Sequence, residues 1–307
     1  MTRIVNNCVA LVCLCLFWGQ SLRAADASHS EQIKWGNESV FNEEHNTLGL
    51  FSGVLGGQIV LAGGTSDDYS RWGRNAVCLS ENAGFALYED VLSKPLAYGA
   101  SITLSDGILC IGGRDSSQCY KDVFLVTMQQ GKLNVSEDWP PLPFPLSNAA
   151  GALLDNKVYL FGGRKSVSPS RLSDSFFVLD LSNKSRGWKE LPGYPGCVRE
   201  DAILVVQNNG VSPCLYLLGG QTETEEWLSS CLTDGYVYNP QLGKWSSLGS
   251  DFPKGICAAV ASGANHILLF QKEPEDTQHL KKENALWKVL IYISTLENHR
   301  KAGVGKS

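Results

Sequence analysis

The chain has 307 residues, of which 43% are hydrophobic and 19% charged, with a formal net charge of −5 at pH 7. That length is enough to bury one substantial core. The mild acidity excludes the basic footprint of a nucleic-acid-binding protein and gives no reason to expect a membrane-surface patch. The 31 glycines against 2 methionines favour many tight turns over long helices.

The N-terminus has the features of a secretory signal peptide, predicted over residues 1–27. Arg3 precedes an unbroken apolar run, Cys8–Trp18, and Ala25-Asp26-Ala27 follows as a cleavage site. This run is short for a membrane span, so an uncleaved N-terminal anchor is the weaker alternative. The mature protein is therefore expected to be secreted or lumenal, without membrane association after cleavage, and to start with a lead-in over residues 28–47.

Three glycosylation triplets agree with export. They begin at Asn37, Asn134 and Asn183, each in a polar, turn-like stretch. Removal of the signal peptide leaves seven cysteines, none with the C-x-x-C spacing of a metal site, so no metal is predicted. Cys197 and Cys231 fall in predicted loops and can pair in an oxidising compartment, although the sequence assigns no bridge.

A repeated unit follows, in which an apolar strand ends in a Gly-Gly pair. The four copies, in chain order, are Ile59–Gly64, Ile108–Gly113, Val158–Gly163 and Leu215–Gly220. The pairs lie 49, 50 and 57 residues apart, a period that suits a four-stranded kelch blade. Glycine is needed where a strand bends or another backbone approaches closely.

The rest of each unit keeps the same internal order. A short strand and a hairpin turn precede the glycine strand, as at Asp155-Asn156-Lys157, and an apolar third strand such as Phe176–Leu179 follows it. The tryptophans that close the second, third and fourth units are Trp139, Trp188 and Trp245. Because blades pack face to face, we expect strands that are apolar on both sides, with these tryptophans wedged between neighbouring blades.

A fifth unit begins in register and then departs from the pattern. His266–Phe270 supplies its second strand, Gln271-Lys272 stands in place of the glycine pair, and Trp287–Ile293 forms one further strand. The chain is therefore predicted to be an all-β, kelch-type β-propeller over residues 48–296, with about four complete blades, a partial fifth and a polar tail over 297–307. The alternative is a β-sandwich with accidental Gly-Gly pairs.

The contents of the blades resemble those of the N-acetylneuraminate epimerases, the sialic acid mutarotases, in their cyclically permuted form. The four segments that carry the resemblance are Leu50–Gly64, Pro95–Gly113, Pro143–Gly163 and Leu191–Arg199. The resemblance covers roughly residues 48–270, and it is specific because the order of these loop motifs is shared in addition to the glycines and tryptophans.

The resemblance implies a six-bladed propeller that interconverts the α and β anomers of a sialic acid or related sugar without a cofactor. In that reaction a base removes the anomeric hydroxyl proton while an acid protonates the ring oxygen. The family places its glutamate in a Gly-Glu-x-x-x-Gly-x-Arg stretch on the last blade of the permuted order. This sequence has no such stretch, so the final blade is expected to be missing and no catalytic residue is assigned.

Three residues are candidates for substrate binding because they lie in loops that lead into innermost strands, where a propeller binds small ligands. Arg199 corresponds to an arginine of the family and would bind the sugar's carboxylate. The alternative is a structural arginine paired with Glu200 or Asp201. Tyr98 and Asn148 each lie fourteen residues before a Gly-Gly pair, and would either hydrogen-bond sugar hydroxyls or cap strands.

Other charged residues have two interpretations each. Arg114 and Arg164 directly follow glycine pairs, so both are expected at the same rim, near the funnel or on a solvated edge. The acidic residues Glu223, Glu225 and Glu226 either replace the missing carboxylate or form a solvent-facing run.

Besides the enzyme, two interpretations stay open. One is a non-catalytic secreted propeller that binds a glycan or protein partner on its loop face, because a fold alone does not establish function. The other is a truncated product of a mutarotase gene, whose two uncovered blade faces would favour a homo-oligomer.

Overall fold

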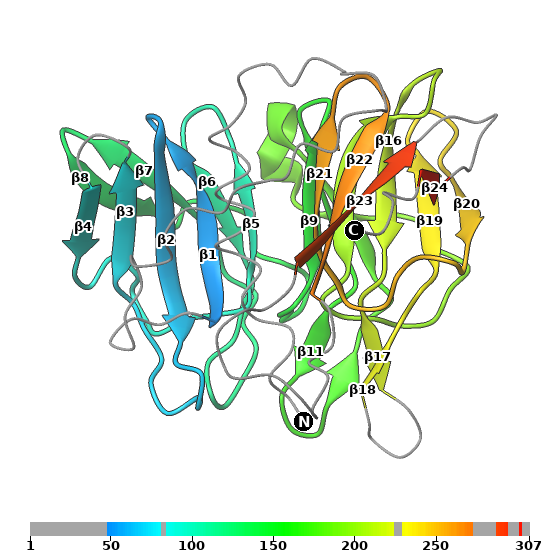
Figure 1. Cartoon of the computed structure of the whole chain (residues 1–307). Helices are drawn as coiled ribbons and strands as arrows, with labels where there is room; N and C mark the ends of the chain where they lie inside the picture. Colours follow the sequence, from blue (N-terminus) through cyan, green and yellow to red (C-terminus); the bar gives the residue numbers. More distant parts are fainter. Residues whose placement is uncertain (1–47, 81–83, 224–228, 273–286, 294–300, 303–307) are drawn as a thin grey trace.

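The structure, a computed structural model, describes residues 48–80, 84–223, 229–272, 287–293 and 301–302. Within these ranges the regular secondary structure is almost entirely β, with five four-stranded antiparallel sheets and two two-stranded ribbons (Figure 1). The predicted all-β propeller is therefore confirmed. The predicted signal peptide, the lead-in and the Asn37 triplet lie outside the described residues.

Each sheet is one blade, and its strands follow one another outward from the axis in chain order. The first holds β1 (Leu48–Leu55), β2 (Gln58–Thr65), β3 (Ala76–Ser80) and β4 (Gly84–Tyr88). The second holds β5 (Ala100–Thr103), β6 (Ile108–Ile111), β7 (Val123–Gln129) and β8 (Lys132–Ser136). The third holds β9 (Ala150–Leu154), β10 (Lys157–Phe161), β13 (Phe176–Asp180) and β14 (Lys189–Glu190).

The two remaining sheets continue the series. The fourth holds β15 (Ile203–Asn208), β16 (Pro213–Leu218), β19 (Gly235–Asn239) and β20 (Lys244–Gly249). The fifth holds β21 (Ile256–Ser262), β22 (His266–Lys272), β23 (Trp287–Ile293) and the two-residue β24 (Lys301–Ala302). A short 3-10 helix, η1 (Leu181–Arg186), joins β13 to β14. The ribbons, which extend below the third and fourth sheets in Figure 1, are β11 (Arg164–Ser166) with β12 (Arg171–Leu172), and β17 (Gln221–Glu223) with β18 (Ser229–Cys231).

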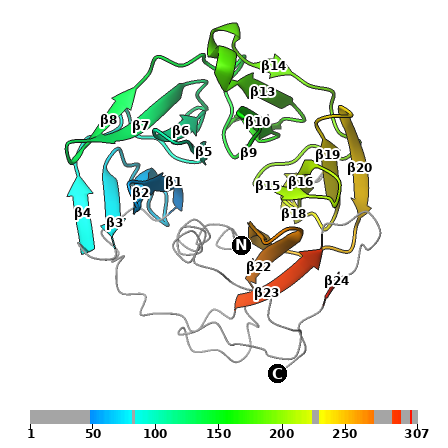
Figure 2. The ribbon, with the colours of Figure 1, turned by 90° about the horizontal axis from the view of Figure 1, so that it is seen from above.

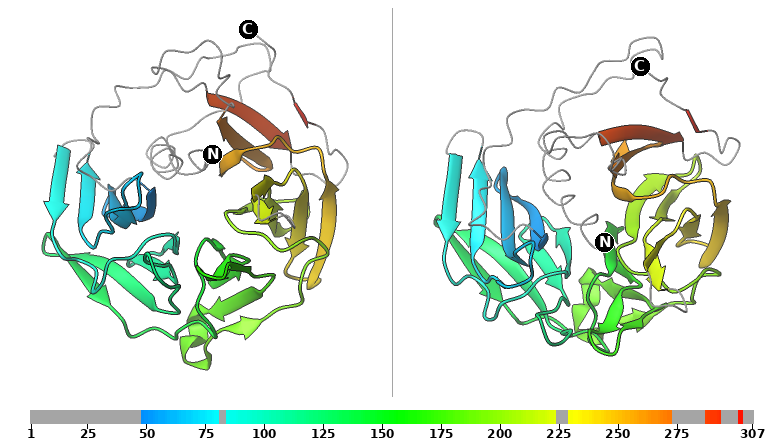
Figure 3. Two further views of the ribbon diagram at one scale, coloured as in Figure 1. Left: turned by 90° about the horizontal axis from the view of Figure 1, so that it is seen from below. Right: turned by 60° about the horizontal axis from the view of Figure 1, so that its bottom comes forward.

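The five sheets are arranged radially around a common axis, as the views along that axis show (Figures 2 and 3). The innermost strands β1, β5, β9, β15 and β21 contact one another in that order, and the outermost strands lie at the periphery. The loops that lead into the innermost strands therefore meet near the axis.

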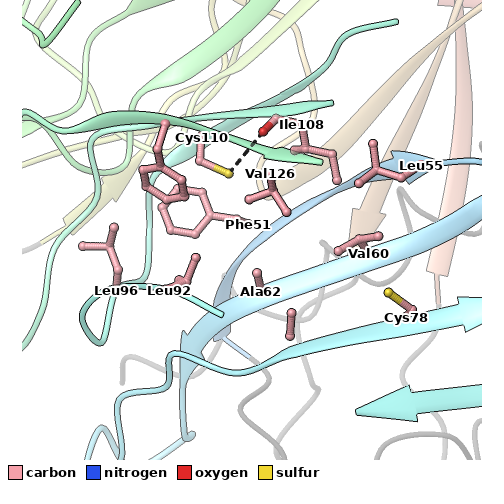
Figure 4. Close-up of a cluster of buried hydrophobic side chains, with 12 residues drawn as sticks. Phe51, Leu55, Val60, Ala62, Cys78, Leu92, Leu96, Ile108, Cys110 and Val126 are labelled. Atoms are coloured by element: carbon pink, nitrogen blue, oxygen red, sulfur yellow. Dashed lines mark hydrogen bonds between the residues drawn. The ribbon is translucent and has the colours of Figure 1, made fainter. Parts of the chain in front are cut away.

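Apolar layers between neighbouring sheets hold the ring together. Between the first and second sheets, Phe51, Val60, Cys110 and Val126 are buried in one cluster (Figure 4). Similar clusters lie between the second and third, third and fourth, and fourth and fifth sheets. Each fully buried side chain of this size contributes about 1.5–3 kcal/mol relative to an exposed one. The blade interfaces are therefore the main source of stability.

The closing tryptophans lie at these interfaces, as predicted. Trp139 and Trp188 pack against the cluster between the second and third sheets, and Trp188 Nε1 donates to the carbonyl of Pro140 at 3.0 Å. Trp245 packs against Phe161 and Phe176 in the next cluster, with ring centroids 6.0 and 5.0 Å away. The tryptophans thus join consecutive blades.

The Gly-Gly pairs are the points at which one blade meets the backbone of the next. Gly112 has φ +63°, and a Cβ there would lie 2.2 Å from the carbonyl oxygen of Leu146 in the following unit. The amide of Gly113 donates to that same oxygen at 2.7 Å. The pairs that begin at Gly63 and Gly162 make equivalent bonds to the next unit. In the fifth sheet, Gln271 and Lys272 instead continue β22 without a bend.

Several surface features bear on the predicted export. The triplet asparagines Asn134 and Asn183 are both exposed, on the outer strand β8 and on η1. Cys197 and Cys231 are exposed and unbridged. No helix in the described part of the chain is long and apolar enough to cross a membrane.

Candidate functional site

Four residues form a belt near the axis, one in β1 and one in each of the loops that lead into β5, β9 and β15. Gly49, Tyr98, Asn148 and Asp201 all have left-handed backbone conformations, with φ between +52° and +64°. The amide of each donates to the carbonyl of the one before: Tyr98 to Gly49 at 2.7 Å, Asn148 to Tyr98 at 2.7 Å, and Asp201 to Asn148 at 3.0 Å. We call these four residues the axial belt. It places the side chains of Tyr98, Asn148 and Asp201 in equivalent positions on successive blades.

A second row of side chains lies beside the belt. Arg114, Arg164 and Gln221 each follow a Gly-Gly pair and bridge to the residue just before a belt residue. The equal spacing predicted that Arg114 and Arg164 share one rim, and the structure places that rim at the axial belt. Polar and charged side chains from the second, third and fourth blades are therefore gathered at one end of the ring.

Asp201 is the central carboxylate of this cluster. Asn148 Nδ2 donates to Asp201 Oδ1 at 2.8 Å, and Gln221 Nε2 donates to Asp201 Oδ2 at 2.7 Å. Burial and the nearby Glu200 carboxylate raise the pKa of Asp201 to about 6, against the opposing effect of these two hydrogen bonds. Each carboxylate oxygen still has an acceptor position for a further donor. Asn148 Oδ1 is buried and has no hydrogen-bond partner within the described residues.

Tyr98 and Arg114 form the neighbouring part of the cluster. The Arg114 guanidinium carbon lies 4.7 Å from the centre of the Tyr98 ring and 5.1 Å from that of Trp72. Burial, followed by a hydrogen bond with Tyr69, raises the pKa of the Tyr98 hydroxyl, so this hydroxyl stays protonated. The positive charge of Arg114 opposes that rise in the pKa of Tyr98, and the negative charge of Asp201 adds to it.

Arg164, in contrast, is already paired. Its guanidinium binds both carboxylate oxygens of Glu200, with Nε donating to Oε2 at 2.8 Å, and it also contacts Glu223 and Ser170. The hydrogen bond with Glu200 is the main cause that raises the pKa of Arg164. Glu223 therefore takes part in an ion-pair network with Arg164 and Glu200, rather than in a solvent-facing run. Glu225 and Glu226 lie outside the described residues.

The structure places Arg199 in a different setting from the one predicted. Its side chain is 0% exposed, and its guanidinium makes two bonds to the Asp234 carboxylate, at 2.7 and 2.8 Å. Further donors reach Tyr194 Oη at 2.8 Å and the carbonyl of Gly219 at 2.9 Å. Because this guanidinium is closed to solvent and its donors are occupied, a sugar carboxylate does not reach it here. The structural alternative fits better, although the partner is Asp234 rather than Glu200 or Asp201.

Of the three predicted binding residues, the structure thus brings Tyr98 and Asn148 together and leaves Arg199 in the wall between blades. The residue that sequence reasoning missed is Asp201. It occupies the same position as Tyr98 and Asn148, but it lies eighteen rather than fourteen residues before its Gly-Gly pair. The extra residues belong to the longer hairpin between β15 and β16. Alignment by the left-handed loop position would have found it.

Two other features lie apart from the axial belt. A cavity of about 430 Å³ lies between the first two blades, and its lining includes Leu92, Asp122 and Trp139 but no belt residue. In the described ranges, no three His, Cys, Asp or Glu side chains gather in the manner of a metal site.

Comparisons with known proteins agree with this fold. Residues 139–273 match the N-acetylneuraminate epimerase family. The N-acetylneuraminate epimerase of Yersinia pestis (strain Pestoides F) is 30% identical over 139 residues, which are 44% of this chain and 33% of that protein. The Haemophilus influenzae (strain PittEE) epimerase is 30% identical over 131 residues, or 43% and 32% of the two chains. This chain therefore spans about a third of the length of the curated relatives it matches.

Two further comparisons extend the similarity. A kelch domain-containing protein of Vibrio cholerae is 30% identical over 141 residues, which are 45% of this chain and 36% of that protein. The solved structure of YjhT superposes with a TM-score of 0.60 at 13% identity, and the match covers 83% of each chain. At that identity the likeness shows the fold alone, and it confirms the kelch-propeller architecture.

Proposed function

We propose that this chain, a relative of the N-acetylneuraminate epimerases, is a sugar-acid mutarotase that interconverts the α and β anomers of N-acetylneuraminate at its axial belt. The family match over residues 139–273 supports the reaction class. The observation that carries the assignment to a site is Asp201, a carboxylate with a pKa of about 6 held near the axis by two amide donors.

The reaction needs a single proton carrier and no redox chemistry. A carboxylate takes the proton of the anomeric hydroxyl, whose oxygen becomes the keto carbonyl as the bond between the anomeric carbon and the ring oxygen breaks. The carboxylic acid so formed then gives that proton to the ring oxygen. The open keto form then turns its carbonyl and closes on the opposite face, with the proton transfers reversed. Every proton removed is returned, so the sugar's composition does not change.

Asp201 has the properties required of that carrier. A general base works best when its pKa lies near the operating pH, and a pKa of about 6 leaves Asp201 mostly ionised at pH 7 yet basic enough to hold a proton. The amide donors of Asn148 and Gln221 fix the plane of the carboxylate. Asn148, which donates to Asp201, and Tyr98, which precedes Asn148 in the belt, are the residues we expect to position sugar hydroxyls.

The test is proton NMR of freshly dissolved single-anomer N-acetylneuraminate, with the spontaneous rate of exchange subtracted. Wild-type protein is expected to accelerate exchange, and Asp201→Asn to lose about 10²- to 10⁴-fold of that acceleration. Asp122→Asn, which removes a surface carboxylate paired with Lys94, is the matched control and should retain the wild-type rate.

Two results would overturn parts of this proposal. Wild-type exchange at the spontaneous rate removes the mutarotase assignment. Full activity of Asp201→Asn keeps the activity but shows that another group carries the proton.

A second candidate function is a non-catalytic propeller that binds the sugar without reacting it. A partial family match and a fold do not by themselves establish catalysis, and the Gly-Glu-x-x-x-Gly-x-Arg stretch is not found in the sequence printed above. Sugar binding with exchange at the spontaneous rate would support this candidate over the enzyme.

We further propose that the protein is exported and glycosylated. The predicted signal peptide over residues 1–27 and the exposed positions of Asn134 and Asn183 support this. In a secretory host, a mobility shift on deglycosylation that is lost in the Asn134→Gln, Asn183→Gln double variant is the expected result. If the shift persists unchanged, these two positions carry no glycan.

A further inference from the structure

We propose that Arg114 is the anchor for the substrate's carboxylate, as a guanidinium held against the rings of Trp72 and Tyr98 with most of its N–H donors unused by the residues that the structure describes. This inference rests on the proposed function, because it names the group that would give the axial belt its selectivity for a sugar acid.

The three arginines of this region differ in what already binds them. Arg199 and Arg164 are each occupied by carboxylates of the chain itself, Asp234 for the first and Glu200 with Glu223 for the second. For Arg114, the hydrogen bond recorded within the described residues is a long one, from Nη1 to the carbonyl of Asp115 at 3.4 Å. A guanidinium has five N–H donors. Arg114 is therefore the arginine whose hydrogen-bonding capacity is left for a ligand.

Its position is set by the aromatic rings rather than by acceptors. The guanidinium carbon lies 5.1 Å from the Trp72 ring and 4.7 Å from the Tyr98 ring, within the range of cation–π attraction. Trp72 is held in turn by its Nε1 donating to the carbonyl of Tyr69 at 3.1 Å, and Tyr98 by the backbone bonds of the belt. Contacts with ring faces leave the N–H edge of a guanidinium free, and that edge binds a carboxylate with two parallel hydrogen bonds.

The location of Arg114 suits the proposed reaction. The guanidinium carbon of the anchor lies 4.7 Å from the Tyr98 ring, and the proton carrier Asp201 is two places along the belt from Tyr98. In a 2-keto sugar acid the carboxylate is bonded directly to the anomeric carbon. A carboxylate bound by Arg114 therefore holds the reacting carbon, one bond away from it, in a fixed place. Such positioning raises the effective concentration of the reacting group at a catalytic residue. A neutral aldose has no carboxylate to form this charged pair with Arg114.

The experiment measures binding separately from catalysis. Equilibrium affinity for N-acetylneuraminate and for its uncharged methyl ester is determined by calorimetry for wild type, Arg114→Lys and Arg114→Gln. Arg74→Lys is the control, because Arg74 is exposed and pairs with Asp90 on the first blade. Loss of a bidentate charged contact is expected to weaken binding of the acid about 10- to 100-fold in Arg114→Gln. The fold-change should be smaller in Arg114→Lys, which keeps the charge without the fork. Affinity for the ester should change less than threefold.

The outcomes separate this inference from the proposed function. Acid binding that depends on Arg114, without accelerated exchange in wild type, supports the anchor and removes the enzyme. Accelerated exchange with acid affinity unaltered in Arg114→Gln removes the anchor and keeps the enzyme. Equal losses for acid and ester in a variant that melts at the wild-type temperature show that Arg114 does not recognise the carboxylate. If Arg114→Gln melts at a lower temperature than wild type, Arg114→Lys takes its place. The ratio of its affinity for the acid to its affinity for the ester must then be lower than in wild type, and an unchanged ratio would contradict the anchor.

Discussion

Arg114 follows the glycine pair of the second sheet and Arg199 lies in the loop that leads into the fourth, and their surroundings are opposite. Arg199 is fully buried and its charge is neutralised by Asp234 within the wall between blades. Arg114 is partly exposed beside the axial belt and is held by ring faces instead of by a carboxylate. The comparison shows that two arginines near the axis differ in their partners, a carboxylate for Arg199 and aromatic ring faces for Arg114.

The largest effect should come from breaking the pair in the wall. Arg199→Met leaves the Asp234 carboxylate without its partner, and such a loss costs about 3–5 kcal/mol in the free energy of unfolding. Urea denaturation followed by tryptophan fluorescence measures it. A cost below about 1 kcal/mol would mean that Arg199 is not a structural residue, and would return it to the list of binding candidates.

The second test concerns the backbone contacts that join the blades. Gly112→Ala places a methyl group 2.2 Å from the carbonyl of Leu146 at a positive φ, whereas Gly131, also at a positive φ, has nothing within 4 Å. We expect Gly112→Ala to cost about 2–4 kcal/mol, from left-handed strain and overpacking together. Gly131→Ala should cost about 1–2 kcal/mol from strain alone. Equal costs for the two would show that the blade junction yields without penalty.

The axial belt was only partly predictable from the sequence. The Gly-Gly spacing predicted the blades, and the equal offsets of Tyr98 and Asn148 predicted that these two share a position. Asp201 escaped because the longer β15–β16 hairpin alters its offset, and Arg199, two residues earlier, drew attention by its charge. The partner of Arg199 could not be found by sequence proximity either, since Asp234 lies 35 residues away and meets it only when the blade folds. The number of residues between a loop residue and the next Gly-Gly pair depends on the length of the hairpin between them as well as on the place of that residue in the blade.

The third test uses the pH dependence of Asp201. Because its pKa in the folded protein is raised to about 6 from an ordinary 3.8, its contribution to stability is full below about pH 4 and is lost as the pH rises through 6. Asp201→Asn lacks this titration. The difference in unfolding free energy between variant and wild type should therefore shift in favour of the variant by about 2 kcal/mol between pH 4 and pH 7. A difference that is flat over this range would mean an ordinary pKa and a weaker case for Asp201 as proton carrier.

The smallest effect is expected for an ion pair on the surface. Arg74 Nε and Asp90 Oδ1 lie 2.6 Å apart, but the two side chains are 46% and 64% exposed. Arg74→Ala should change the unfolding free energy by less than about 1 kcal/mol, and by less still at high salt. Comparison with Arg199→Met shows whether the larger loss of unfolding free energy at the Arg199–Asp234 pair comes from burial or from charge pairing as such. A cost near that of Arg199→Met would contradict that explanation.

The axial belt repeats the same left-handed backbone conformation from one blade to the next. Gly49, Tyr98, Asn148 and Asp201 share one backbone geometry and one set of main-chain bonds, so the scaffold at each position does not depend on the side chain it carries. Glycine at the first position is required by its neighbour, because a Cβ there would lie 2.8 Å from the Tyr98 ring. The other three positions each carry one side chain on a successive blade. Substitutions at these positions would change the groups near the axis while the apolar walls between the blades stay as they are.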